Sequence, residues 1–174
     1  RLAFESNKDE TYFRARLALL MKPALSSMSL RKKDISDLTR RGLNPILAGN
    51  TQYMQRSTST LIVNLVGLHE AIFNILGFED NKEGREILHK VIETAVDVAK
   101  KKGKEIGDNV SICMTESEGS ARFATLDGEK YGKNSVLQSL QGKPYSEGIS
   151  FDATEILQLS IKNEKIVECN NIIV

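Results

Sequence analysis

The sequence predicts an α/β fold in which buried strands alternate with helices. Two short runs of β-branched and other apolar residues, TLIVNLV at 60–66 and NVSICMT at 109–115, are typical of strands with both faces buried. Between them, residues 82–102 place apolar side chains at three- and four-residue spacing, which is typical of an amphipathic helix. This alternation favours one structural unit over residues 1–174, with its sheet either open or closed into a barrel.

The N-terminal part is predicted to be helical. Apolar residues recur at helical spacing over 9–25, and the acidic pair that opens this segment suits the positive end of a helix dipole. Pro23 has no amide hydrogen, so we expect it to disturb or kink the end of the helix. A shorter amphipathic piece follows at 35–39, and the Gly and Asn-Pro within 40–50 predict a loop.

The remaining elements follow the two predicted strands. Gly67 allows a tight turn after the first strand, and LHEAIFNIL predicts a helix from 68 to Gly77. After the second strand, a polar loop opens into a further helix. A capping pattern begins another helix at 152–165, and NNIIV at 170–174 predicts a last strand.

The composition is that of an ordinary soluble protein and excludes several functional classes. Net charge is +1, from 24 basic and 23 acidic residues, so nothing favours nucleic acid or an anionic membrane as a partner. No apolar run approaches the ~20 residues of a membrane helix. Two cysteines, Cys113 and Cys169, are too few for a disulfide framework and indicate a cytoplasmic protein. Because the chain opens with Arg1 rather than Met, we expect a segment of a longer protein.

His69 and Glu70 look like the start of a zinc-protease helix, but the pattern does not continue. A second histidine is needed four residues after the first, and position 73 is Phe. His89, the other histidine, lies in a different predicted helix, so no metal site is predicted. We interpret His69 and Glu70 as the start of a scaffold helix. The sequence also has no GxxxxGK[ST] or GxGxxG phosphate loop and no GxSxG elbow.

Glu116 and Glu118 are the candidate catalytic residues. They directly follow the second predicted strand, and groups just past the C-terminal end of a strand line the ligand crevice of α/β sheets. A carboxylate at that place can exchange protons with a substrate hydroxyl. The alternative, that both are surface charges before the next helix, stays open. Cys113 is interpreted as a small buried side chain rather than a reactive thiol.

Four segments, in the same order, resemble anaerobic class III ribonucleoside-triphosphate reductases of the archaeal type. RLAFES is similar to the end of that family's NLPRLA segment, and STSTLIVNLVGLHEAI is similar to its strand, turn and Gly-Leu-Asn-Glu-Ala helix. ESEGSARFATLDGEKYG resembles its Glu-containing loop, which leads into Arg-Phe, Asp and Tyr-Gly. KPYSEGI is similar to the Tyr-(Thr/Ser)-(Asn/Glu) loop that follows.

The resemblance implies an oxidoreductase that makes deoxyribonucleotides for DNA replication by glycyl-radical chemistry. It implies a ten-stranded α/β barrel of the pyruvate formate-lyase type, of which this chain is a central fragment. The N-terminal cone, the finger-loop cysteine and the C-terminal domain with its glycyl radical and structural zinc would lie outside it. We therefore expect no cofactor in this segment and no activity from it alone. The implied partners are ribonucleoside triphosphates, a radical-SAM activating enzyme and a second copy of the protein.

The resemblance also assigns site residues. Glu118 best matches the family's glutamate, but the usual spacing to Arg-Phe is one residue longer, so Glu116 remains an alternative. Four residues are expected to bind substrate: Ser57, Ser59, Asn64 and Met114. Three are expected to be scaffold, as an ion pair and a core anchor: Arg122, Phe123 and Asp127. The alternative functions are a small nucleotide-binding or regulatory domain without radical chemistry, and an unrelated α/β enzyme with Glu118 as its base.

Overall fold

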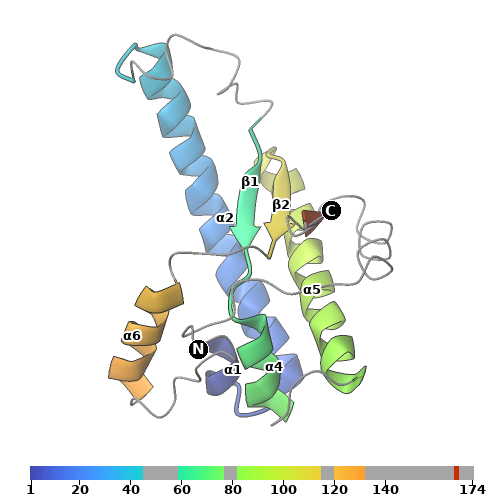
Figure 1. Ribbon diagram of the computed structural model, residues 1–174. Helices are drawn as coiled ribbons and strands as arrows, with labels where there is room; N and C mark the ends of the chain where they lie inside the picture. Colours follow the sequence, from blue (N-terminus) through green and yellow to red (C-terminus); the bar gives the residue numbers. More distant parts are fainter. Residues whose placement is uncertain (45–58, 77–81, 115–119, 132–166, 169–174) are drawn as a thin grey trace, which may run out of the picture.

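A computed structural model of the chain places parallel strands against long helices (Figure 1). It describes residues 1–44, 59–76, 82–114, 120–131 and 167–168. The helices are α1 (Leu2–Glu5), α2 (Glu10–Arg40), α4 (Leu68–Leu76), α5 (Lys82–Ile106) and α6 (Ser120–Tyr131). The strands are β1 (Leu61–Asn64), β2 (Val110–Cys113) and β3 (Val167–Glu168).

The described sheet has three strands in the order β1-β2-β3, and both pairings are parallel. The chain leaves β1 through α4 and α5 before it returns in β2, so the predicted alternation of strands and helices is confirmed over these residues. A ten-stranded barrel remains a prediction. No helix within the described ranges is both long and apolar enough to span a bilayer.

The core lies between the sheet and the two long helices. All four residues of β2 are buried, as predicted, and Ile112 is fully enclosed. Helix α5 contributes its predicted apolar face, on which Leu88 and Ile92 have 1% and 0% of their surface exposed. Burying side chains of this size stabilises the fold by roughly 1.5–3 kcal/mol each. The interior of this α/β layer therefore follows directly from local sequence pattern.

Helix α2 continues well past the place where the sequence predicted its end. The prediction of a helix over 9–25 and a separate piece at 35–39 is wrong, because one helix runs from Glu10 to Arg40 with Pro23 inside it. Proline removes a single backbone hydrogen bond. The buried side chains of α2 lie on both sides of that point in the chain, with Met21 before it and Leu25 after it. Packing against the core thus outweighs the local preference to stop.

Strand β1 differs from its prediction on one face. Leu61 is buried, but Ile62 is 49% exposed, so β1 is not buried on both faces. Within the described residues, β1 is an edge strand of the sheet, with β2 as its neighbour on one side. This position explains the difference, because an edge strand is covered less than a central one. Other predictions, including the helix at 152–165 and the strand at 170–174, lie outside the described residues. The two-residue β3 was not predicted.

Gly103 lies in the last turns of α5, close to the entry into β2. A Cβ at this position would lie 2.9 Å from the backbone oxygen of Asp108 and 3.2 Å from Cγ2 of Val110. Alanine ordinarily stabilises a helix interior by roughly 1 kcal/mol relative to glycine. Here the backbone of the following turn would have to move, so the sign of the effect reverses.

We expect Gly103→Ala to lower the free energy of unfolding by about 1–3 kcal/mol, as overpacking generally does. Urea unfolding followed by circular dichroism measures this change. Lys101→Ala, at an exposed position of the same turn, is the matched control and should shift stability by less than about 0.5 kcal/mol. A midpoint for Gly103→Ala equal to or above that of the wild type would contradict the proposed clash.

Candidate functional site

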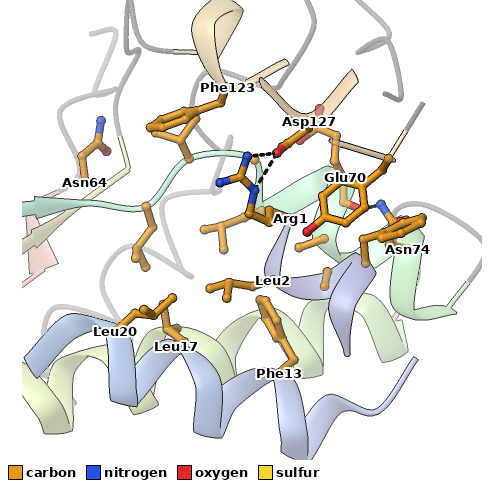
Figure 2. Close-up of a pocket in the computed structure, with 18 residues that line it drawn as sticks. Arg1, Leu2, Phe13, Leu17, Leu20, Asn64, Glu70, Asn74, Phe123 and Asp127 are labelled. Carbon is orange, nitrogen blue, oxygen red and sulfur yellow. Dashed lines mark hydrogen bonds and ion pairs between the residues drawn. The ribbon is translucent and has the colours of Figure 1, made fainter. Parts of the chain in front are cut away.

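A cavity of about 430 Å³ lies just beyond the C-terminal end of β1 (Figure 2). Asn64 is the last residue of β1, and Leu65 to Gly67 form the turn into α4, with Gly67 at a φ of +76°. Side chains of α1, α2, α4 and α6 complete the walls. Ligand sites of parallel α/β sheets lie at this end of the strands. The cavity is therefore the candidate functional site.

One wall of the cavity is apolar. It is formed by Phe13, Leu17 and Leu20 of α2, and Phe123 of α6 lies across the cavity from them (Figure 2). Phe123 is 49% exposed, so the prediction that it anchors the core is wrong for this structure. Helix α6 lies beside α1 rather than over the sheet core (Figure 1). The Phe123 side chain therefore borders the cavity instead of entering the core.

The polar part of the cavity comes from β1 and α4. Asn64 reaches it from the strand end, and Glu70 and Asn74 reach it from α4. Glu70 is only 7% exposed, and Asn74 Nδ2 donates a 2.7 Å hydrogen bond to its backbone oxygen. Residues four apart lie on the same helix face, which is why these two side chains share one wall.

Sequence reasoning missed Glu70 as a cavity residue. On α4, Glu70 and Asn74 lie on the side away from the buried Leu68, Ile72 and Ile75. A polar pair opposite an apolar face ordinarily faces solvent. In the structure, α1 and α4 pack together, which makes this polar face a cavity wall. No local pattern in the sequence distinguishes the two cases.

An ion pair joins α6 to the start of the chain. Arg1 Nη2 lies 2.5 Å from Asp127 Oδ1, and Arg1 Nε donates to the same oxygen at 2.7 Å. The hydrogen bond with Asp127 raises the pKa of Arg1 above its ordinary value. Asp127 is therefore in an ion pair, but with Arg1 and not with Arg122, the only basic residue in the predicted scaffold group. Arg122 is exposed.

The Arg1–Asp127 pair influences what the cavity can bind. Arg1 is the only cationic side chain among the described residues that line it, and Asp127 neutralises its charge. Glu70 adds a further carboxylate to the wall. Phosphate groups bind at clustered cations or at helix N-termini. Among the described walls there is no cluster of unpaired cations, and the N-terminal turn of α4 is the one feature that could bind an anion, so most of the wall suits an uncharged, hydroxyl-bearing group.

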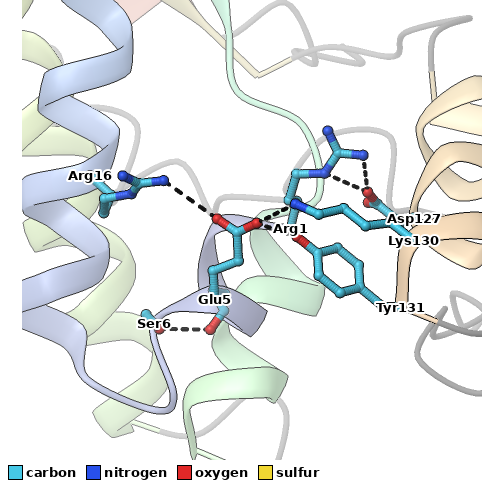
Figure 3. Close-up of polar contacts among 8 residues, drawn as sticks. Arg1, Glu5, Ser6, Arg16, Asp127, Lys130 and Tyr131 are labelled. Atoms are coloured by element: carbon cyan, nitrogen blue, oxygen red, sulfur yellow. Dashed lines mark hydrogen bonds and ion pairs between the residues drawn. The ribbon is translucent and has the colours of Figure 1, made fainter.

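A second polar cluster holds α6 against α1 (Figure 3). The Glu5 carboxylate accepts a 2.9 Å hydrogen bond from Lys130 Nζ and another from the Tyr131 hydroxyl, and Arg16 Nη2 lies 3.5 Å away. The ring of Tyr131 also packs on Phe4, with centroids 4.9 Å apart. The hydrogen bonds from Lys130 and then Tyr131 lower the pKa of Glu5 from 4.5 to about 2.

This pKa shift predicts a pH-dependent contribution to stability. The folded-state pKa of Glu5 lies below its ordinary value, so its contribution is complete above about pH 4.5 and is lost as the pH falls toward 2. We expect the difference in Tm between the wild type and Glu5→Gln to be largest at pH 5–7 and to vanish near pH 2. Both proteins carry the same other carboxylates, so the difference in Tm between them removes the effect of titrating those groups.

Glu129→Gln is the matched control for this measurement. It removes an exposed carboxylate beside Lys130 on α6, and its Tm difference from the wild type should not change over the same pH range. A Tm difference for Glu5→Gln that stayed constant down to pH 2 would show that the Glu5 cluster does not stabilise the docked helix.

The other predicted site residues fall in several places. Ser59 lies before β1, at the opposite end of the strand from Asn64, where its backbone oxygen accepts a 2.7 Å hydrogen bond from Lys32 Nζ. At ~3.3 Å per residue, Leu61 to Asn64 alone spans about 10 Å. Met114 is 3% exposed and belongs to the core cluster. Three predicted residues lie outside the described residues: Ser57, Glu116 and Glu118.

Of the predicted residues that the structure describes, Asn64 lines the cavity, whereas Ser59 and Met114 do not. Cys113 is buried at 5% exposure, as predicted. Within the described ranges, no three His, Cys, Asp or Glu side chains are arranged to hold a metal ion. His69 and His89 belong to α4 and α5, two different helices.

Comparison with known proteins adds to this geometry. A sequence model of a family described as anaerobic ribonucleoside-triphosphate reductase matches residues 1–163. No curated protein sequence matches the chain. Among solved structures, the anaerobic ribonucleotide reductase from Thermotoga maritima with glycerol in the active site has a TM-score of 0.70 and 19% identity, over 84% of this chain and 24% of that one.

Two further structures are similar. The Thermotoga maritima enzyme with citrate in the active site gives a TM-score of 0.71 at 18% identity, over 98% of this chain and 38% of that one. Another anaerobic ribonucleotide reductase gives 0.71 at 21% identity, over 83% of this chain and 23% of that one. Identities this low support a shared fold. The chain spans between about a quarter and two fifths of the length of these structures.

Proposed function

The chain belongs to the anaerobic ribonucleoside-triphosphate reductase family, and on that premise we propose that it is a central segment of the catalytic barrel of an enzyme that reduces ribonucleotides to deoxyribonucleotides. The observation that carries this proposal is the family match over residues 1–163, nearly the whole chain. The parallel β1 and β2, with a cavity at the C-terminal end of β1, agree with it.

We propose ribonucleoside triphosphates as the substrates, with the ribose directed toward Asn64. A side-chain amide carries both donors and an acceptor, so Asn64 can bind a ribose hydroxyl in either role. A structure of the similar Thermotoga maritima enzyme was solved with dATP and CTP. Because the cavity walls are poor in unpaired cations, the triphosphate would extend away from them. Glu118, or alternatively Glu116, would exchange protons with the ribose hydroxyls.

The finer parts of the proposal concern the whole protein. A glycyl radical, held outside this segment, would supply hydrogen-atom abstraction. A radical-SAM enzyme would generate that radical, and the part of the protein that holds the radical would also hold a structural zinc ion. The protein would belong to the archaeal-type branch of the family and would be a homodimer. Its place would be the cytoplasm, where it would supply deoxyribonucleotides for DNA replication. What supports these points is the family match.

The test is anaerobic turnover of ribonucleotides by the intact protein with its activating enzyme. We expect Asn64→Ala to raise KM about 10-fold with little change in kcat, because losing one hydrogen bond in a binding site is worth about 1.4 kcal/mol. Thr60→Ala, at an exposed position before β1, is the matched control and should leave both constants unchanged.

Two results would contradict this proposal. Tight nucleotide binding without any reduction by the intact protein would favour the nucleotide-binding or regulatory domain. Normal KM for Asn64→Ala in an active enzyme would remove the cavity from the substrate site while leaving the family assignment in place.

A further inference from the structure

Two buried carboxylates belong to the wall of the cavity at the end of β1. Asp127 of α6 and Glu70 of α4 are 6% and 7% exposed, and both line the cavity. Carboxylates are rarely buried to this extent unless they are paired, because removing a charge from water is costly. In Figure 2 the two residues lie on one side of the view and Asn64 lies on the other. A ligand in the cavity therefore meets two negative charges in an otherwise largely apolar wall.

Asp127 neutralises the only cationic side chain among the described residues that line the cavity. Arg1 Nη2 and Nε both contact Asp127 Oδ1, at 2.5 and 2.7 Å. Burial lowers the pKa of the Arg1 α-amino group, which favours its uncharged form, and in a longer chain this nitrogen would be an amide. A guanidinium group binds phosphate well, because its N–H groups match two phosphate oxygens. With Asp127 in place, two of those N–H groups already hold a carboxylate.

Glu70 neutralises the other feature of the described walls that could attract an anion, the N-terminal turn of α4. Ala71 N donates to Gly67 O at 3.0 Å at the start of this helix, so the amides of Leu68 and His69 have no acceptor within the helix. Together with the helix dipole, such amides form a site for phosphate. Glu70 places a buried carboxylate in this same turn, where its charge matches the dipole.

We propose that Asp127 and Glu70 are specificity-determining residues that exclude phosphate from the cavity. Each carboxylate occupies a position at which the described walls could otherwise bind an anion, and each would repel a phosphate that approached it. The nucleotide can then enter ribose first, toward Asn64, but not phosphate first. Only the identity of this ligand rests on the proposed function, because the exclusion of anions follows from the charges of the cavity itself.

Removing the two charges should convert the cavity into an anion site. Inorganic tripolyphosphate is the probe, and isothermal titration calorimetry of the intact protein measures its binding. Asp127→Asn and Glu70→Gln should each strengthen binding about 10-fold over the wild type, and the double variant about 100-fold. A factor of 10 corresponds to ~1.4 kcal/mol, the low end of the range for a hydrogen bond to a charged group. A gain of binding cannot result from misfolding.

Two further variants locate the gained binding. Arg1→Gln, added to the double variant, removes the guanidinium group and should reduce the gain about 10-fold. Glu129→Gln removes an exposed carboxylate from α6 and should bind tripolyphosphate like the wild type. Glu70→Gln leaves the Arg1–Asp127 contact intact, so its own gain is measurable even if Asp127→Asn loosens α6.

Two results of the binding experiment would overturn the proposal. The first is tripolyphosphate binding that stays at the wild-type level in both Glu70→Gln and the double variant. The second is a gain in the double variant that is fully kept when Arg1 is replaced, because the new site would then lie outside the cavity.

Turnover by the intact protein separates this inference from the proposed function. In the double variant a nucleotide can also bind phosphate first, without reacting, and such non-productive binding lowers kcat and KM by the same factor. We expect kcat and KM to fall together, with kcat/KM unchanged. An active enzyme whose variants gain no anion binding would overturn the inference and leave the function standing. Gained anion binding in a protein that reduces no ribonucleotide would support the inference and contradict the function.

Discussion

Replacing Asp108 with Ala is expected to lower the free energy of unfolding by about 3–5 kcal/mol, the usual effect of removing one member of a buried ion pair. Lys32 Nζ lies 2.7 Å from Asp108 Oδ1, and the two side chains are only 10% and 2% exposed. Ser29 Oγ donates a 2.5 Å hydrogen bond to the other carboxylate oxygen. Without the carboxylate, the buried ammonium group loses its counter-charge while it remains largely removed from water.

The position of the Asp108 carboxylate makes this loss unusually important. The same Lys32 ammonium group donates to the backbone oxygen of Ser59, so one network joins α2, the entry into β1 and the turn between α5 and β2. Domains are stable by about 5–15 kcal/mol in total. Losing 3–5 kcal/mol would therefore leave a measurable unfolded fraction in mild denaturant.

Urea unfolding followed by circular dichroism provides the measurement. Glu105→Ala is the control, because it removes a 66% exposed carboxylate from its pair with Lys102 and should cost less than about 1 kcal/mol. A combined Lys32→Met and Asp108→Leu variant should recover most of the loss, since apolar pairs often replace buried ion pairs without penalty. A loss below about 1 kcal/mol for Asp108→Ala would contradict this account of the network.

Replacing Glu118 with Gln in the intact enzyme is expected to reduce kcat by about 10²–10⁴-fold, the typical contribution of general acid–base catalysis. Glutamine keeps the shape of the side chain and its capacity for hydrogen bonds, but it cannot exchange a proton. KM should therefore change little. Glu118 follows the end of β2 by a few residues of chain and precedes α6, which the Arg1–Asp127 and Glu5 contacts hold beside the cavity.

The measurement is anaerobic turnover across a pH range, with Glu116→Gln assayed in parallel. If Glu116 is the proton-transfer group, the loss will appear in that variant and Glu118→Gln will retain activity. Glu129→Gln, on the exposed side of α6, is the control and should turn over normally. Wild-type rates in both Glu116→Gln and Glu118→Gln would exclude either carboxylate from proton transfer.

Local periodicity predicted most of the described elements. The apolar face of α5 and the β-branched run of β2 were identified from spacing and residue type, because each element buries a pattern that is visible along the chain. Pro23 misled the prediction of α2, because a single lost hydrogen bond weighs less than a helix face packed into the core. The exposure of Ile62 depends on which strands lie beside β1, and no local pattern contains that information.

The candidate site was predictable only in part. Asn64 was assigned to the substrate site through the family resemblance, inside a strand predicted to run to residue 66, and the structure places it at the end of β1 on the cavity wall. Phe123 was expected in the core through the family resemblance, yet it borders the cavity at 49% exposure. Side chains of this kind are positioned by whichever helix packs opposite them, which is a property of long-range contacts.

By itself, the sequence determined the alternation of strands and helices, the buried faces of β2 and α5, and the family to which the chain belongs. These properties depend on residue types at short spacing, which backbone geometry converts directly into buried faces. Only the tertiary structure decided that Glu70 and Asn74 face a cavity rather than solvent, and that Lys32 is buried against Asp108. In each case the deciding contact joins residues far apart in the chain. Without that contact, the same polar side chain would be hydrated at the surface.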